Sequence, residues 1–243
     1  MGDATIRRSQ GMARGNTKSR DVVQAVVEST YCIGEVIADA AFRVEDRHPE
    51  GEGPWKMEAD KVAWKDPATG MDCIIRRSKR GGYLCGYVGV PPQHPLFGFE
   101  GSALEALGIH PHGGVDHGAP CEEWEPEPIS VCHVRDQNAT KKRNSARAAA
   151  AADIDRQHDH AWWFGFSCNK PGDLQPSRLD ASPSVRGSRV GLKSVYRNET
   201  YVLGHVVDLA AQLHAIGDGL DVPVAKAPAA PARGLDPDTC GIS

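Results

Sequence analysis

Three short apolar runs separated by two tight turns constrain the fold of this chain more than any other feature. The runs are residues 61–65 (KVAWK), 71–76 (MDCIIR) and 83–90 (YLCGYVGV), and each has the length of a β-strand. The first turn, residues 66–70 (DPATG), has proline in its second position and ends on glycine, as β-turns commonly do. The second turn is residues 79–82 (KRGG). Short runs joined by tight turns predict an antiparallel meander.

Three later segments extend the predicted domain. Residues 162–166 (WWFGF) place four aromatic side chains in five positions of a chain that is only 6% aromatic, which predicts a buried strand. Residues 129–134 (ISVCHV) are a further candidate strand. Residues 196–216 carry apolar side chains at helical spacing, among them Val202 and Val206, and predict an amphipathic helix.

These elements predict an α+β fold, in which an antiparallel sheet of about four to six strands is packed by the C-terminal amphipathic helix. The predicted single α+β domain spans residues 54–216. The residues expected in its core are Trp64, Ile74, Tyr87, Val88, Phe164, Phe166, Val206 and Leu209.

The rest of the chain is expected to form loops or to lie outside this domain. Residues 1–20 predict disorder, and residues 21–53 predict an N-terminal helix, over 21–45, followed by a linker. Residues 91–128 are rich in proline, glycine and histidine and predict a long functional loop. An alanine-rich insertion at about 135–160 has no apolar stripe, so it predicts a helix that projects into solvent. Residues 217–243 predict a disordered Pro/Ala tail.

Composition limits the classes of partner. The chain has 28 Lys and Arg against 32 Asp and Glu, a formal net charge of −4, and its basic clusters are short, so no nucleic-acid partner is expected. No apolar run approaches the ~18 residues of a membrane span, so no membrane partner is expected either. Seven cysteines without a CxxC pair argue against a disulfide framework. We expect a soluble protein of a reducing cytosol.

The strand at residues 162–166 runs into a polar corner that holds a thiol, an amine and a carboxylate. Cys168, Lys170 and Asp173 lie there around a Pro-Gly turn. A cation beside a thiol lowers the pKa of the thiol, so Cys168 next to Lys170 is a candidate nucleophile. His112, from the loop at 110–117, would act as the base and Asp173 would orient it. Trp163, within the strand, is a candidate binding residue.

The loop at residues 110–117 (HPHGGVDH) is the densest group of possible metal ligands. Imidazoles and carboxylates are ligands of zinc, iron and manganese. The segment resembles the H-x-H-x-D-H motif of metallo-β-lactamase-fold hydrolases, but two extra residues before Asp116 displace the carboxylate and break the match. The alternative is a polar glycine loop, in which Gly113 and Gly114 let the backbone approach a bound molecule closely.

A second possible metal site combines Cys121, Cys132, His133 and Cys168. Side chains at adjacent positions of one strand point to opposite faces, so Cys132 and His133 cannot both bind one ion without a bulge. Free cysteines buried as small apolar residues are the alternative. No metal ligand and no cofactor is therefore assigned, and the chain lacks the P-loop that would indicate nucleotide hydrolysis.

Residues 83–98 (YLCGYVGVPPQHPLFG), the triplet at 112–114 (HGG) and residues 162–173 (WWFGFSCNKPGD) together resemble an uncharacterised family of bacteriophage and prophage proteins. Members look like GYVGVPxGHPLxG, then VHGGLTY or VHGGLTF, then ICHVP, then WFGFDCxHxGD, and close with a helix of the YVxAExxxLAxQL kind. Residues 131–134 (VCHV) and 201–213 are similar to the later pieces. The resemblance covers roughly residues 54–215.

The resemblance implies a bacteriophage context, action in the host cytoplasm and the location of a site, but no particular reaction. This chain departs from the family pattern at three positions: Asp116 replaces a Thr, Ser167 replaces an Asp and Lys170 replaces a His. The residues that stay in register are His112, Gly113, Gly114, Cys168, Gly172 and Asp173.

Two function classes follow from these patterns. The first is a phage-encoded accessory enzyme, a small hydrolase or transferase on a small polar substrate, with His112, Cys168, Lys170 and Asp173 as catalytic residues. The second is a non-enzymatic module that binds a host protein or a nucleotide signal, because binding tolerates the loss of the family's Asp and His better than catalysis does. A structural part of a virion or replication complex is the third alternative.

Overall fold

The computed structural model describes residues 23–24, 30–122, 125–132, 160–178 and 194–228. The segment at 1–20 that is predicted to be disordered lies outside the described residues, as does the alanine-rich insertion except for its last residue. His133, one of the candidate metal ligands, also lies outside them.

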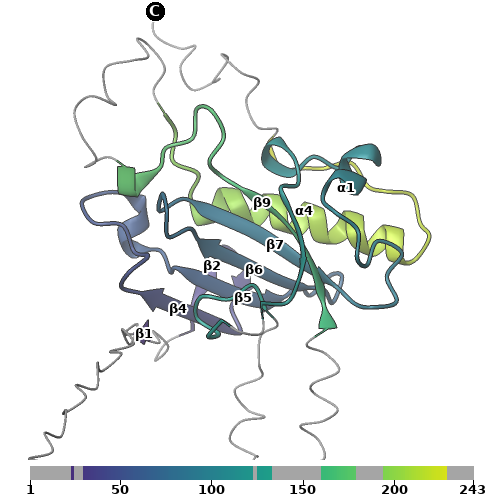
Figure 1. Cartoon of the computed structure of the whole chain (residues 1–243), viewed down its shortest axis with the longest axis horizontal. Coiled ribbons are helices and arrows are strands. Elements are labelled where there is room, and N and C mark those ends of the chain that lie inside the picture. Colours follow the sequence, from purple (N-terminus) through teal and green to yellow (C-terminus); the bar gives the residue numbers. More distant parts are fainter. Residues whose placement is uncertain (1–22, 25–29, 123–124, 133–159, 179–193, 229–243) are drawn as a thin grey trace, which may run out of the picture.

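Most of the described strands form one antiparallel sheet (Figure 1). Its seven strands lie in the order β1 (Val23–Gln24), β4 (Ala40–Val44), β5 (Lys61–Lys65), β6 (Asp72–Arg77), β7 (Leu84–Val90), β9 (Trp162–Ser167) and β8 (His117–Pro120). A separate antiparallel pair joins β2 (Cys32–Ile33) to β3 (Val36–Ile37). Helix α4 (Glu199–Gly217) lies across one face of the large sheet, which confirms the predicted α+β fold with a C-terminal helix packed on the sheet.

The predicted meander is confirmed as strands β5, β6 and β7, which pair with one another in sequence order. The first turn is held by Asp66, whose Oδ2 accepts hydrogen bonds from the Thr69 backbone N–H (2.9 Å) and hydroxyl (2.7 Å). Gly70 ends this turn with a φ of 70°, a conformation that glycine adopts without strain. Local turn chemistry therefore fixes the register of the central strands.

Helix α4 starts at the cap residue Asn198, whose side-chain oxygen accepts the Tyr201 N–H at 2.9 Å. Its apolar stripe, which includes Val202, Val206 and Leu209, is buried against β6 and β7. Gly86 of β7 makes this close approach possible, since a Cβ atom there would lie 2.5 Å from Val206 Cγ2. The absence of a side chain at Gly86 therefore lets the helix lie close to the sheet.

Both faces of the sheet are buried, and successive side chains of β9 alternate between them. On the face under α4, Phe164 and Phe166 join the larger core cluster. On the opposite face, Trp163 packs with Tyr87 in a second cluster. All eight residues predicted for the core are buried: Trp64, Ile74, Tyr87, Val88, Phe164, Phe166, Val206 and Leu209.

The predicted helix over residues 21–45 is wrong. The described part of this segment forms strands β1 to β4, and β4 pairs with β5, with Ala41 opposite Val62. The segment is rich in valine and isoleucine, which fit a pleated surface better than a helix. The short 3₁₀ helix η1 (Pro54–Met57) follows directly after the predicted linker.

Two further predictions need correction. The region 91–128 is not one long loop, because it includes α1 (Ser102–Ala106), the 3₁₀ helix η2 (Pro111–Gly113) and edge strand β8. The described part of the predicted strand at 129–134, residues 129–132, has no strand pairing. Another 3₁₀ helix, η4 (Pro176–Arg178), follows β9.

The predicted disorder of the C-terminal tail is wrong for its first part. After α4 ends, the chain turns back along the helix, and Asp208 Oδ2 accepts the backbone N–H groups of Lys226 and Ala227, both at 2.6 Å. Gln212 also donates to the Pro223 carbonyl at 3.0 Å. Among the helices of the described residues, none has the length and apolar character needed to cross a lipid bilayer.

Candidate functional site

The loop around η2 and the turn after β9 bring His112 and Asp173 together. Nε2 of His112 lies 2.7 Å from Oδ2 of Asp173, and both side chains are at most 2% exposed. The same oxygen accepts the Lys170 backbone N–H at 2.8 Å, and Arg197 Nε donates to Oδ1 at 3.0 Å. Asp173 is therefore a fully engaged buried carboxylate.

These contacts keep Asp173 ionised. Burial alone would raise the pKa of its carboxyl, but the hydrogen bond and charge of His112 and the hydrogen bonds from Arg197 and Lys170 outweigh burial and hold the pKa below its usual value. A charged carboxylate accepts from Nε2–H, so in the neutral His112 ring the other nitrogen, Nδ1, is the acceptor.

That acceptor faces Tyr201, whose hydroxyl lies 2.8 Å from His112 Nδ1. Burial raises the pKa of Tyr201 to about 12, although the Arg197 guanidinium, 4.8 Å from the ring centre, opposes the rise. The hydroxyl therefore stays protonated and donates to the imidazole. Arg197, Asp173, His112 and Tyr201 form one hydrogen-bonded chain that reaches the half-buried surface of α4 at Tyr201.

A second, more exposed cluster lies next to this chain. Lys170 Nζ pairs with Asp116 Oδ2 at 2.8 Å, and the Ser167 hydroxyl donates to Asp116 Oδ1 at 3.2 Å. The side chains of Lys170 and Asp116 are 28% and 34% exposed. Asp116 therefore contacts both Ser167 and Lys170, the two other positions at which the sequence departs from the predicted resemblance.

Lys170 connects the two clusters, because its backbone contacts Asp173 while its side chain contacts Asp116. The two glycines predicted to bind a molecule support this junction. Gly113 has a φ of 75°, and a Cβ there would lie 3.2 Å from the Lys170 stem; Gly114 has a φ of 106°, and a Cβ there would lie 2.6 Å from Glu105 Oε1. Both glycines have a positive φ, which other residues adopt only with strain, so they allow this path of the loop beside Lys170.

The other two candidate residues, Cys168 and Trp163, are buried. Cys168 is 1% exposed, and burial, with the nearby Asp173 charge, raises the pKa of its thiol well above the usual value. Its neighbours include the aromatic core under α4. Trp163 is fully buried on the opposite face of the sheet from Phe166, which contacts His112. Of the predicted site residues, the fold thus assembles His112, Gly113, Gly114, Lys170 and Asp173.

The candidate metal ligands do not converge. His110 is exposed, whereas His117 packs edge-on against Tyr87 on the sheet face opposite α4. Cys121 and Cys132 form a disulfide on that same face, so the prediction of free buried cysteines is wrong for this pair, while Cys168 is free and belongs to the core under α4. In the described part of the chain no group of three or more His, Cys, Asp or Glu side chains is placed to hold a metal ion.

Three polar residues of the candidate site were not predicted from the sequence. These residues are Arg197, which lies just before α4, and Tyr201 and His205, which lie on the helix one turn apart. Their periodicity places Tyr201 and His205 on the apolar stripe, so it indicates only packing. The sequence signal that could have identified them is the polar group at the end of each side chain, because a buried phenol or imidazole needs a hydrogen-bond partner.

Comparison with protein-family models, with curated proteins and with solved structures finds no match to this chain. The resemblance to bacteriophage and prophage proteins therefore stays a prediction.

Proposed function

We propose that this chain is a phage-encoded accessory protein that binds a small polar molecule at the surface of Asp116, Ser167 and Lys170. A carboxylate, a hydroxyl and an ammonium group side by side offer both acceptors and donors to a molecule that carries hydroxyl, amino or carboxyl groups. The resemblance supports the phage context and, with it, the host cytoplasm as the place of action.

The double attachment of Lys170 carries this proposal. Exposed ion pairs are ordinarily mobile and weak. Here the Lys170 backbone donates to the buried carboxylate of Asp173, which His112 and Arg197 hold in turn, while the Lys170 side chain pairs with Asp116. Polar groups that are already fixed lose less conformational entropy when a molecule binds. The buried hydrogen bonds of Asp173 therefore hold Lys170 in place at the exposed recognition surface.

Burial favours binding over nucleophilic catalysis. A thiol with a raised pKa and 1% exposure is a poor nucleophile, which argues against Cys168. Both ring nitrogens of His112 are occupied, by Asp173 and Tyr201, so neither can contact a substrate. His112 and Asp173 act in this proposal as positioning residues.

One observation favours an enzyme as the second candidate. Asp173, His112 and Tyr201 are arranged as orienter, base and hydroxyl, the order used by nucleophile–base–orienter triads. Within the hydrogen-bonded chain, His112, Asp173 and Arg197 are buried and Tyr201 is half-buried. A substrate would therefore reach the chain at Tyr201. A hydrolase or transferase on a small polar substrate would then use Tyr201 where the sequence suggested Cys168.

Incubation of the purified full-length protein with the polar metabolites of a host bacterium separates these functions. Mass spectrometry of the retained and free fractions is the measurement. Retention of an unchanged compound supports the binding proposal, and conversion of a compound supports the enzyme. A host protein captured in parallel, with no compound retained or converted, would contradict both.

A further inference from the structure

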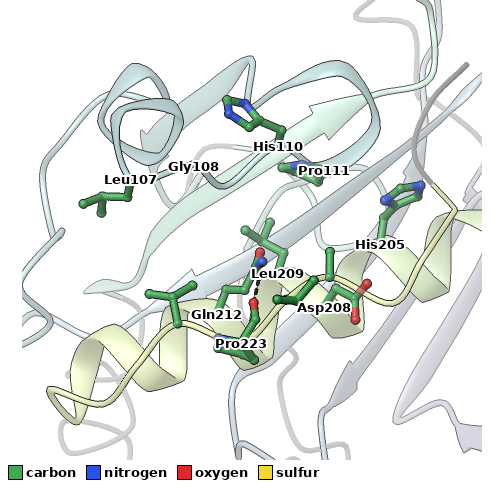
Figure 2. A pocket seen from close by; sticks show the side chains of 12 residues that line it. Leu107, Gly108, His110, Pro111, His205, Asp208, Leu209, Gln212 and Pro223 are labelled. Carbon is green, nitrogen blue, oxygen red and sulfur yellow. Dashed lines mark hydrogen bonds between the residues drawn. The ribbon is translucent and has the colours of Figure 1, made fainter. Parts of the chain in front are cut away.

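The disulfide between Cys121 and Cys132 lies on the sheet face opposite α4 and joins residues 11 positions apart in the chain. Cys121 is 4% exposed, whereas Cys132 is only half-buried, so Cys132 is the more accessible partner. The pocket of about 380 Å³ that Figure 2 shows lies beside α4, and neither cysteine lines it. The disulfide is therefore a separate feature of the opposite face.

The chain between the two cysteines covers cationic side chains of the sheet. Lys61 of β5 is 1% exposed, and its Nζ donates a hydrogen bond to the backbone carbonyl of Glu127. Arg76 of β6 donates from Nη1 to the backbone carbonyl of Ile129 at 2.8 Å. Residues 125–131 (the covering segment) therefore bury the Lys61 ammonium group against the sheet.

The covered arrangement contains unfavourable contacts as well as favourable ones. Oε1 of Glu127 is buried without a hydrogen-bond partner among the described residues, which costs free energy. Burial disfavours the charged form of Lys61 and lowers its pKa to about 8, although the charge of Glu127 opposes this change. Ile129 and Val131 hold the covering segment through their buried apolar side chains. The disulfide adds to this hold, because a cross-link removes conformations that an open segment could adopt.

We propose that Cys121 and Cys132 form a redox-active disulfide, a site of exchange with small thiols of the glutathione type, whose reduction releases the covering segment from Lys61. Cys132 is half-exposed, and exposed disulfides are the labile ones. Disulfides of cytosolic proteins are usually transient in this way. The choice of reductant rests on the cytoplasmic location proposed above, and the rest of the inference is independent of the proposed function.

The exchange takes two steps. A small-thiol thiolate attacks Sγ of Cys132 and forms a mixed disulfide with it, while Cys121 leaves as a thiolate and takes up a proton. A second thiolate attacks the small-thiol sulfur of the mixed disulfide, so Cys132 leaves as a thiolate, takes up a proton, and a small-molecule disulfide forms. Two thiols are thereby oxidised to one disulfide, and the protein disulfide gains two electrons and two protons. Opening of the covering segment then becomes more favourable, because the cross-link is gone.

Incubation of the full-length protein with excess glutathione, without denaturant, tests both parts of the proposal. Alkylation with iodoacetamide and peptide mass spectrometry should find Cys121 and Cys132 as free thiols after the incubation. In the same samples, acetylation by an N-hydroxysuccinimide ester should modify Lys61 about tenfold or more faster than in the oxidised protein. Lys65, on the same strand with a 55%-exposed side chain, is the matched control and should react at the same rate in both states.

Two variants and one buried thiol show whether the release is local. The double variant Cys121→Ser with Cys132→Ser should acetylate Lys61 at the fast rate without glutathione, whereas Cys32→Ser, which removes an exposed free thiol, should respond as the natural chain does. Cys168, buried under α4, should stay unlabelled in both states. The natural chain decides the question even if the double variant does not fold. The proposal is overturned if glutathione leaves the disulfide intact, if Lys61 keeps its slow rate after reduction, or if reduction also exposes Cys168.

Discussion

The imidazole of His112 and the carboxylate of Asp173, 61 residues apart in the chain, meet at 2.7 Å in an almost fully buried contact. The contact joins the η2 loop to the turn that follows β9, and Tyr201 extends it to helix α4. Three segments that share no strand pairing are therefore held together by one histidine.

Replacing that histidine should cost much of the stability of the fold. His112→Ala leaves Asp173 without its imidazole partner and Tyr201 without its acceptor, and we expect the free energy of unfolding to fall by about 3 kcal/mol. Urea denaturation measures the change. His110→Ala, two residues away at an exposed position, is the matched control and should stay within about 0.5 kcal/mol. Equal effects of the two variants would contradict the role of the buried pair.

His205 should make stability depend on pH. Its folded pKa, about 4, lies below the ordinary value of 6.5, so the unfolded chain takes up a proton first as the pH falls. Stability is therefore complete above about pH 6.5 and decreases between pH 6.5 and about 4, by about 3 kcal/mol for this group. The titratable groups that act on the ring are His112, Asp208 and Arg197.

The measurement for His205 is the difference in unfolding free energy between the natural chain and His205→Leu across this pH range. The difference should shift in favour of the variant as the pH falls to 4. The contribution of Asp173 begins to decrease only below its ordinary pKa of 3.8 and is lost as the pH falls through its lowered folded pKa, and it is common to both proteins. A pH-independent difference would show that His205 is not buried in its neutral form.

Cys168 should be unreactive in the folded protein. Its burial and raised thiol pKa leave almost no accessible thiolate near pH 8, whereas Cys32 is exposed. Brief treatment with iodoacetamide, followed by peptide mass spectrometry, should label Cys32 and leave Cys168 unmodified until denaturant is added. Rapid labelling of Cys168 in the native state would restore it as a candidate nucleophile.

Two glycines should respond oppositely to the same change. Gly86→Ala places a Cβ 2.5 Å from Val206 and 2.6 Å from Phe166, so we expect a loss of about 1–3 kcal/mol through overpacking. Gly204→Ala, within α4, meets only Ala227 at 3.6 Å and should gain up to about 1 kcal/mol from helix propensity. Thermal melts of both variants check the pair, and a neutral Gly86→Ala would contradict the close approach of α4 to β7.

The central strands and α4 could be predicted from the sequence because their signals are local. The meander follows from turn residues that lie between its own strands, and the helix follows from its apolar period. Strand β8 has no such signal in its sequence, HGAP, and forms through pairing with β9, with Gly118 opposite Phe164. The N-terminal strands were missed for the same reason, since β4 depends on its pairing with β5.

The sequence pointed to residues of the candidate site but not to the contacts between them. His112 and Asp173 were both singled out, yet their contact depends on the path of a loop that no local pattern sets. The burial of Cys168 could have been foreseen, because it has the same parity along the chain as Phe164 and Phe166, which face the core. Arg197 and Tyr201 could be recognised as site residues only once α4 was placed on the sheet.

We propose that Lys170, held by Asp116 and Asp173, forms the recognition surface for a small polar molecule. Native mass spectrometry of full-length protein after incubation with host polar metabolites tests it most directly, on the natural chain, on Lys170→Met and on Lys65→Met. Lys65 pairs with Asp72 at 2.7 Å on β5 and serves as the matched exposed ion pair outside the site. We predict that the natural chain and Lys65→Met retain the same compound and that Lys170→Met retains none; retention by Lys170→Met at the natural level would contradict the account.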